Sequence, residues 1–193
     1  MADIWLMRHG AYEGHRPGHH APHEAALTEE GRDQTRRSLP LPNDITAIVT
    51  SPLPRARQTA TLIAQLTGLP IVAMSGLLAE WRAPSIVLGR TAENYPPAYR
   101  AWRTRRLTNP TLRCEDGESL TDLHTRATHC AAFLHHTAQR HGPILAVSHT
   151  LLLGTLLHLP SSAVAAFTTA TRAPWPFATL RPLPHPSAPP HTP

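Results

Sequence analysis

Apolar residues gather in short runs along the chain, and the segments between the runs have helical character. Runs of four or five residues are too short for helices and are typical of buried strands. We therefore predict four strands, at residues 3–7, 47–50, 71–74 and 144–147. Helices are predicted between and after them, at residues 28–37, 55–66, 119–142 and 150–157.

Capping residues mark the ends of several predicted helices. Thr28 is a good N-cap and is followed by two glutamates, whose charge complements the positive end of a helix dipole. Ser119 and Asp122 have the spacing of a capping box. Gly68 fits the end of the second helix. These signals support the helix positions independently of the apolar pattern.

Strands that alternate with helices favour right-handed crossovers and a mostly parallel sheet. The predicted fold is therefore α/β, a three-layer sandwich with helices on both faces of the sheet. The pattern is interrupted at residues 81–117, where aromatic residues and arginines gather, and we interpret this segment as a small, partly helical cap. We expect one domain over residues 1–181, with a short strand around 177–180, and a Pro-rich tail over 182–193.

Bulk properties narrow the class of protein. The 193 residues carry a formal net charge of +5, which favours anionic partners such as phosphorylated metabolites. No recognised nucleic-acid module accompanies the charge, so no nucleic-acid partner is expected. Asp3 interrupts the first apolar run and no run approaches the roughly 18 residues of a membrane span, so we expect neither a signal peptide nor a membrane segment. Cys114 and Cys130 are interpreted as free thiols of a cytoplasmic protein.

Polar side chains follow the predicted strands at one edge of the sheet. Because ligands bind beyond the carboxyl ends of the strands in such sheets, side chains that follow different strands are expected to meet in one pocket. Four segments, one after each strand, supply candidates: Arg8 with His9, Arg55, Glu80, and His149.

Two arginines and two histidines in one pocket suit a phosphate monoester, which needs fixed positive charge and several donors. Arg8 and Arg55 carry planar guanidinium groups that match phosphate oxygens. His9 can attack phosphorus through a ring nitrogen if its imidazole is neutral and held in one tautomer. A backbone carbonyl in the turn at Gly10 can accept from its other nitrogen. The pattern therefore predicts nucleophilic catalysis of phosphoryl transfer.

The remaining candidates complete such a reaction. His149 is a further donor to the phosphate oxygens, on which charge develops in the transition state. Glu80 is the candidate general acid for the leaving oxygen and afterwards the base that activates water. Thr150, which follows His149, is a further candidate for phosphate binding. With the phosphate neutralised in this way, we expect no metal and no cofactor.

Six segments resemble sequence blocks of the histidine phosphatase superfamily, also called the phosphoglycerate-mutase-like family. They come in the family's order over about residues 3–157: Leu6-Met7-Arg8-His9-Gly10, Leu27-Thr28-Glu29-Glu30-Gly31-Arg32-Asp33-Gln34, Thr50-Ser51-Pro52-Leu53-Pro54-Arg55-Ala56-Arg57-Gln58-Thr59-Ala60, Leu78-Ala79-Glu80, Gly117-Glu118-Ser119 and Val147-Ser148-His149. The resemblance implies a phosphohistidine at His9 and a phosphate pocket of Arg8, Arg55 and His149. It also implies that Glu80 is the proton donor.

The chain departs from the family pattern directly after Gly10. Many members have Glu, Gln or Asp at the next position, where this chain has Ala11. Many also have a polar phosphate contact a few positions on, and no clear equivalent stands out among Tyr12, Glu13 and His15. The rim of the pocket is therefore where this chain is expected to differ from its family.

Some roles stay open on the sequence alone. Glu13 and Glu118 compete with Glu80 for the role of proton donor. Four histidines of the first loop match no compact zinc pattern, so we interpret the segment as a flexible loop over the pocket mouth: His15, His19, His20 and His23. The aromatic residues and arginines of the cap either contact the substrate or form an ordinary solvated helical face.

The preferred hypothesis is a phosphatase that hydrolyses phosphate monoesters of small metabolites through a phosphohistidine. One alternative is a phosphoglycerate-type mutase, which must keep its phosphoenzyme from water and calls for a longer, closing cap. A phosphoprotein or phosphohistidine phosphatase and a non-catalytic phosphate-binding module are further alternatives. We expect a small phosphorylated substrate as the partner, and a monomer or homodimer.

Overall fold

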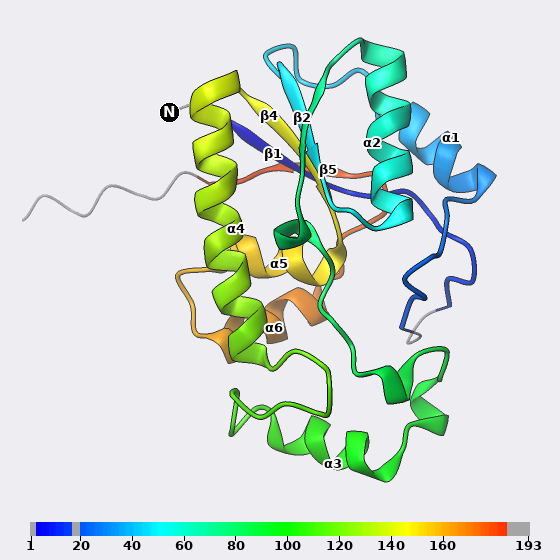
Figure 1. The fold of residues 1–193 in the computed structure, drawn as a ribbon, viewed down its shortest axis with the longest axis vertical. Coiled ribbons are helices and arrows are strands. Elements are labelled where there is room, and N and C mark those ends of the chain that lie inside the picture. Colours follow the sequence, from blue (N-terminus) through cyan, green and yellow to red (C-terminus); the bar gives the residue numbers. More distant parts are fainter. Residues whose placement is uncertain (1–2, 17–19, 185–193) are drawn as a thin grey trace, which may run out of the picture.

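The computed structural model describes residues 3–16 and 20–184, which build a five-stranded sheet with helices on both faces (Figure 1). The strand order is β3-β2-β4-β1-β5, in which four parallel strands are bordered by an antiparallel fifth. The strands are β1 (Ile4–Arg8), β2 (Ala47–Thr50), β3 (Ile71–Met74), β4 (Ile144–Ser148) and β5 (Leu180–Pro182). The predicted α/β fold with a mostly parallel sheet is confirmed.

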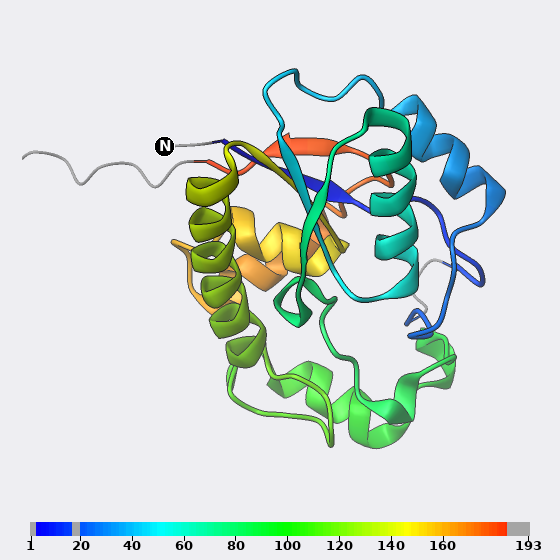
Figure 2. The same ribbon diagram turned by 45° about the horizontal axis from the view of Figure 1, so that its top comes forward.

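Alternate strand residues divide the core into two layers, as the two-residue period of a strand requires. On β1, Leu6 packs in one cluster and Met7 in the other, and on β4 Ala146 and Val147 alternate in the same way. Helix α2 packs against the second face with α1 beside it, whereas α4, α5 and α6 pack against the first (Figure 2). Among the described residues no helix has the length and apolar character that crossing a membrane requires. The helices are α1 (Glu29–Arg37), α2 (Pro54–Thr67), α3 (Pro97–Arg105), α4 (Leu120–His141), α5 (Thr150–Leu157) and α6 (Ala163–Arg172).

The predicted helix ends are confirmed. The Thr28 hydroxyl accepts a hydrogen bond from the Gly31 N–H at the start of α1, and Ser119 with Asp122 forms the capping box of α4. Gly68 ends α2 in the left-handed conformation, with φ 75°. Capping residues at the helix ends therefore determine where α1 and α4 begin and where α2 ends.

Helix α6 is not among the predicted elements. Ser162 caps it, and its buried face consists of Ala166, Phe167 and Ala170. Small alanine side chains give a weak apolar signal, but they allow close packing: a Cβ on Gly154 of α5 would lie 2.5 Å from the Ala170 Cβ. The α5–α6 pair is thus held by backbone proximity that the apolar pattern does not reveal.

The C-terminal segment differs from the prediction in position. Strand β5 covers residues 180–182, rather than the region around 177–180, and pairs antiparallel with β1. Leu183 is buried, and its N–H donates to the Ile4 carbonyl at 2.8 Å. The first residues of the expected tail thus belong to the sheet edge, and its residues 185–193 lie outside the described part of the chain.

The segment at residues 81–117 forms a cap below the carboxyl edge of the sheet, built from α3 and two 3-10 turns, η2 (Ser85–Val87) and η3 (Ala92–Asn94) (Figure 1). Its aromatic residues pack on one another. The Trp81 and Trp102 rings are stacked with centroids 5.9 Å apart, and Tyr99 stacks on Trp102 at 5.2 Å. These three side chains are buried, so this part of the cap is a small aromatic core rather than a solvated face.

The turn after β1 is pressed against the first turn of α1. A Cβ on Gly10 would lie 2.3 Å from the Gly31 carbonyl oxygen, and a Cβ on Gly31 would lie 2.0 Å from the Ala11 carbonyl oxygen. The Ala11 N–H donates to the Gln34 side chain at 2.9 Å, and the Thr28 N–H donates to the Ala11 carbonyl at 3.1 Å. Only glycine fits at positions 10 and 31, and this contact fixes the turn that carries His9.

Candidate active site

His9 follows β1 and is buried at the centre of the site. Its Nδ1 lies 2.7 Å from the Gly10 carbonyl oxygen, which can only accept, so Nδ1 carries the proton. Its Nε2 accepts a hydrogen bond from Arg55 Nε at 3.3 Å. Burial, and then the charge of Arg55, lower the pKa of His9 well below its ordinary value. The imidazole is therefore neutral at pH 7, and the lone pair of Nε2 is directed at Arg55.

Arg55 reaches His9 from the first turn of α2. It also donates to the Pro22 carbonyl at 3.2 Å, and its guanidinium carbon lies 5.1 Å from the centre of the Tyr12 ring. Burial lowers its pKa, but a guanidinium stays protonated in proteins. No carboxylate lies within 4.0 Å of it among the described residues, so its charge is available to an anionic ligand.

Arg8 is the last residue of β1 and lies on the other side of the turn. It donates to the Trp175 carbonyl, and its guanidinium carbon stands 3.7 Å from the centre of the Phe177 ring. Its Nε is buried and has no hydrogen-bond partner in the described part of the chain. The segment that precedes β5 therefore orients Arg8, and the Nε–H of Arg8 remains able to donate to a ligand.

His149 directly follows β4, and its ring centre lies 4.9 Å from that of His9. Its Nε2 is 2.8 Å from the Ser51 hydroxyl, which lies just after β2. Its Nδ1 is buried without a hydrogen-bond partner among the residues described. Burial is the main cause that lowers its pKa well below the ordinary value. The carboxyl ends of β1, β2 and β4 thus meet here, as the sequence predicts.

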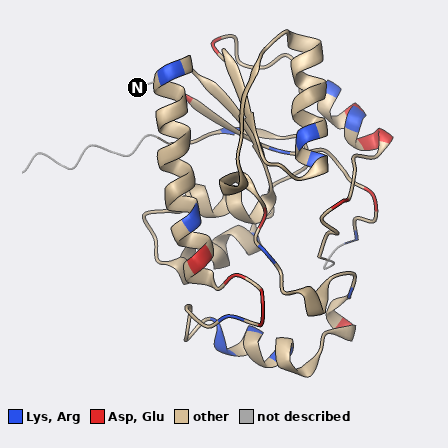
Figure 3. Ribbon diagram, in the orientation of Figure 1, with Lys and Arg blue, Asp and Glu red and all other residues tan. Residues whose placement is uncertain are grey.

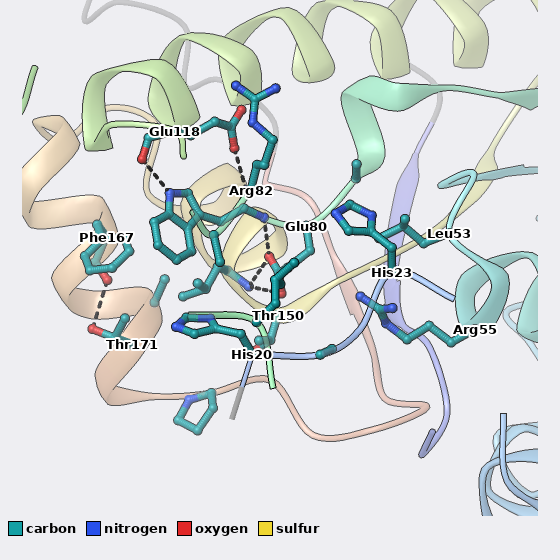
Figure 4. Close-up of a pocket in the computed structure, with 18 of the residues that line it drawn as sticks. His20, His23, Leu53, Arg55, Glu80, Arg82, Glu118, Thr150, Phe167 and Thr171 are labelled. Carbon is teal, nitrogen blue, oxygen red and sulfur yellow. Dashed lines mark hydrogen bonds between the residues drawn. The ribbon is translucent and has the colours of Figure 1, made fainter. Parts of the chain in front are cut away.

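Glu80 approaches from the segment after β3 and lines the same cavity as His9 (Figure 4). Its carboxylate accepts from the backbone N–H of Trp81 at 2.9 Å and from those of Leu151 and Leu152 at 3.2 Å. The last two belong to the first turn of α5, whose N-cap residue His149 offers no side-chain cap. Glu80 is therefore tied to the helix start beside the second histidine.

The two competing carboxylates are placed differently. Glu13 is exposed and does not line the cavity. Glu118 forms a largely buried ion pair with Arg126, with contacts of 2.7 Å and 2.8 Å, and also accepts from the Arg82 N–H. Glu118 lines the cavity but is neutralised by Arg126, whereas Glu80 accepts, among the described residues, only from backbone N–H groups.

Arg126 of α4 fixes the segment that carries Glu80. Besides its bonds to Glu118, the guanidinium donates to the carbonyls of Leu77 at 3.1 Å, Ala79 at 2.7 Å and Glu80 at 3.3 Å. Its side chain is only 17% exposed. The Arg126–Glu118 pair therefore holds in place the segment that carries Glu80.

Arg126→Met is expected to slow the enzyme through Glu80. A shift of about 1 Å in a catalytic group costs about 10²-fold in rate, so kcat for an alkyl phosphate should fall by that order. p-Nitrophenyl phosphate, whose leaving group needs little protonation, should lose far less. Steady-state kinetics on both esters check this, and Arg126→Lys should recover part of the loss. Equal losses on both esters would contradict the positioning role.

One cavity of about 820 Å³, between the sheet edge and the cap, is lined by Arg8, His9, Arg55, Glu80 and Arg126. His149 is buried beside His9 and is not among the residues that line this cavity. Thr150 lines it, and its hydroxyl accepts from the Trp175 N–H at 2.9 Å. Three of the four loop histidines, His15, His20 and His23, also line the cavity, and His19 lies outside the described residues. The described residues contain no group of three or more His, Cys, Asp or Glu side chains that could hold a metal ion.

Comparison with known proteins settles the family. A model of the histidine phosphatase superfamily, branch 1, matches residues 4–170. The chain belongs to the histidine phosphatase superfamily. The match includes the cap and the five predicted site residues Arg8, His9, Arg55, Glu80 and His149. The resemblance that the sequence blocks suggested is thus confirmed.

Proteins similar to this chain carry two kinds of name. A protein of Escherichia coli O1:K1 / APEC named "Probable phosphoglycerate mutase GpmB" is 30% identical over 172 residues, which cover 84% of this chain and 78% of that protein. The alpha-ribazole phosphatase of Shigella flexneri superimposes with a TM-score of 0.74 at 22% identity, over 93% of this chain and 89% of that one. A mycobacterial glucosyl-3-phosphoglycerate phosphatase gives a TM-score of 0.71 at 22% identity, over 94% and 89%. The two structures share the fold.

Several residues of the site were not among those predicted from the sequence. Ser51, Phe177 and Arg126 contact His149, Arg8 and the Glu80 segment from distant parts of the chain. Ser51, which contacts His149, and Glu118, which contacts Arg126, lie inside sequence blocks that resemble the family. Their place in these blocks is the feature of the sequence that could have pointed to them. Phe177 and Arg126 lie outside the blocks, and nothing in their local pattern marks them.

Proposed function

We propose that this chain hydrolyses phosphate monoesters of small metabolites through a covalent phosphohistidine on His9. One observation carries the proposal. The Gly10 carbonyl fixes the proton on Nδ1 of a buried, neutral His9, so that Nε2 offers its lone pair beside Arg55. An imidazole prepared in this way is a nucleophile, and the cations around it suit a phosphate group.

The residues divide the reaction between them. Arg8 and Arg55, which line the cavity with Thr150, bind the phosphate oxygens. His149, buried beside His9, is a further donor to them. His9 Nε2 forms a bond to phosphorus while the ester P–O bond breaks, and Glu80 supplies the proton that the leaving oxygen takes. Glu80 then removes a proton from water, which attacks phosphorus and breaks the P–N bond. Phosphate leaves, and His9 returns to its neutral form.

Hydrolysis is favoured over transfer because of the size of the cavity. A mutase must keep its phosphoenzyme away from water. The cavity that His9 lines, about 820 Å³, is far larger than a phosphate group and therefore has room for water as well. The mutase reading remains the second candidate because of the name of the 30% identical relative.

Phosphate release from a panel of metabolite monoesters separates the two activities. We expect free phosphate from one class of substrate, an acid-labile phosphoenzyme in rapid-quench samples, and rates that a chelator leaves unchanged. Interconversion of 2- and 3-phosphoglycerate that is faster than phosphate release would instead identify a mutase. If no ester yields either phosphate or phosphoenzyme, the chain is a binding module and the proposal fails.

A further inference from the structure

The cavity has more positive charge than one phosphate group requires. Seven of its lining residues are arginines, and two are carboxylates, Glu80 and Glu118. Arg126 is neutralised by Glu118, and Arg8 and Arg55 serve the reacting phosphate. Three of the others belong to the cap: Arg82, Arg103 and Arg106. Figure 3 shows the basic residues of α3 and its neighbourhood at the end of the molecule away from the sheet.

Arg106 directly follows α3 and is the most enclosed cap arginine. Its guanidinium carbon lies 4.8 Å from the centre of the Trp102 ring and 4.6 Å from that of Phe167. Its Nε is buried, and no described residue forms a hydrogen bond with it. No carboxylate of the described chain lies within 4.0 Å. A desolvated cation without an anion is costly, so the position suits a charged ligand.

The surroundings of Arg106 indicate what such a ligand contains. Arg103 lines the same cavity, with its guanidinium carbon 5.6 Å from the centre of the Tyr95 ring. Tyr95, Tyr99 and Phe167 line the cavity together with these arginines and with His9. The cavity therefore combines one pair of arginines from the sheet edge, a second pair from the cap, and aromatic side chains.

We propose that Arg106, assisted by Arg103, is a second anion-binding subsite, so that the substrate is a phosphate monoester with a second anionic group on an apolar or aromatic body. The inference rests on the proposed function. The second group is a carboxylate or a phosphate, because both accept hydrogen bonds from a guanidinium. The reacting phosphate lies at Arg8 and Arg55, the body lies against the aromatic side chains of the cavity, and the second anion meets Arg106.

The alternative is that Arg106 only joins the cap to α6 by stacking between Trp102 and Phe167. Three variants separate charge from stacking. Arg106→Lys keeps the charge, and Arg106→Met keeps the apolar stem and removes the charge. Arg105→Met is the matched control, because Arg105 is the neighbouring residue, is exposed and does not line the cavity.

Benzyl phosphates are suitable probes because the methylene group insulates the leaving oxygen from the distal substituent. We would measure kcat/KM for benzyl phosphate, 4-carboxybenzyl phosphate, its methyl ester and 1,4-bis(phosphonooxymethyl)benzene, together with the biphenyl analogues that place the second anion farther away. The ratio of kcat/KM for each anionic probe to that for the neutral ester is the readout, since a general loss of activity cancels in it.

The ratio should be about 10-fold to 100-fold in the wild type, as expected for hydrogen bonds to a charged group. It should fall close to 1 in Arg106→Met, recover in part in Arg106→Lys and stay unchanged in Arg105→Met. The carboxylate and phosphate arms show which anion is preferred. A ratio near 1 at both lengths in the wild type, or an equal ratio in wild type and Arg106→Met, overturns the subsite. Failure of the proposed function is distinct, because then no probe releases phosphate.

Discussion

Replacement of His9 by alanine is expected to abolish phosphate release and the acid-labile phosphoenzyme. Removal of a covalent nucleophile costs a factor on the order of 10⁴ to 10⁶ in kcat. Water cannot substitute for the lost step, because the remaining groups bind phosphate without supplying a neutral imidazole in contact with Arg55. The measurement is phosphate release over hours, combined with rapid-quench trapping of radiolabelled phosphate.

The fold of the His9→Ala variant should persist, because the turn is fixed mainly by the contact of Gly10 with Gly31. Circular dichroism and thermal unfolding check this. His129→Ala is the control, because His129 is exposed on α4, away from the cavity, and this variant should keep full turnover. Turnover by His9→Ala within about 100-fold of the wild type would exclude the covalent mechanism, since loss of a covalent nucleophile costs on the order of 10⁴-fold or more.

Replacement of Glu80 by glutamine is expected to have the second-largest effect, and the effect depends on the leaving group. Loss of a general acid costs about 10²-fold to 10⁴-fold for an alkyl phosphate. p-Nitrophenyl phosphate should be slowed much less, because nitrophenolate leaves without a proton. The amide oxygen of glutamine can still accept from the N–H groups of α5, so the local fold should be kept.

A plot of log kcat against the pKa of the leaving alcohol measures the dependence, and it should steepen in Glu80→Gln. Glu13→Gln is the control carboxylate, exposed and outside the cavity, and should leave the slope unchanged. Arg126→Met combined with Glu80→Gln should be little slower than Glu80→Gln alone, since both act through one group. Equal losses on good and poor leaving groups would remove Glu80 from the acid role.

The sheet edge explains why the central residues could be predicted from the sequence. Arg8, His9 and His149 lie at strand ends, where a parallel sheet brings side chains together irrespective of their distance along the chain. Arg55 and Glu80 follow the other two parallel strands. A short apolar run predicts a strand, and the polar residue that follows it is then predicted to lie at the edge of the sheet where the site forms.

The contacts that orient these groups could not be predicted in this way. Phe177 contacts Arg8 from an irregular segment before β5. Arg126 contacts the Glu80 segment from a polar position of α4 that the sequence pattern would place on the solvent-facing side. Both contacts depend on how separate elements pack against each other. Such packing produces no periodic pattern of residues in the sequence around Phe177 or Arg126. Helix α6 could not be predicted for a related reason, because its alanines give little apolar contrast. Phe167, which lies on this helix and packs against Arg106, was therefore not predicted either.

The place of β1 in the sheet has a consequence for the order in which the protein is made. This strand is synthesised before the other four, yet both of its neighbours, β4 and β5, lie far along the chain from it. Contacts between such distant segments form slowly. Until residues 175–183 are synthesised, Arg8 lacks the carbonyl and the ring that orient it, and the apolar β1 has an unpaired edge. A chain that stops before β5 would therefore keep an exposed strand edge, which favours aggregation.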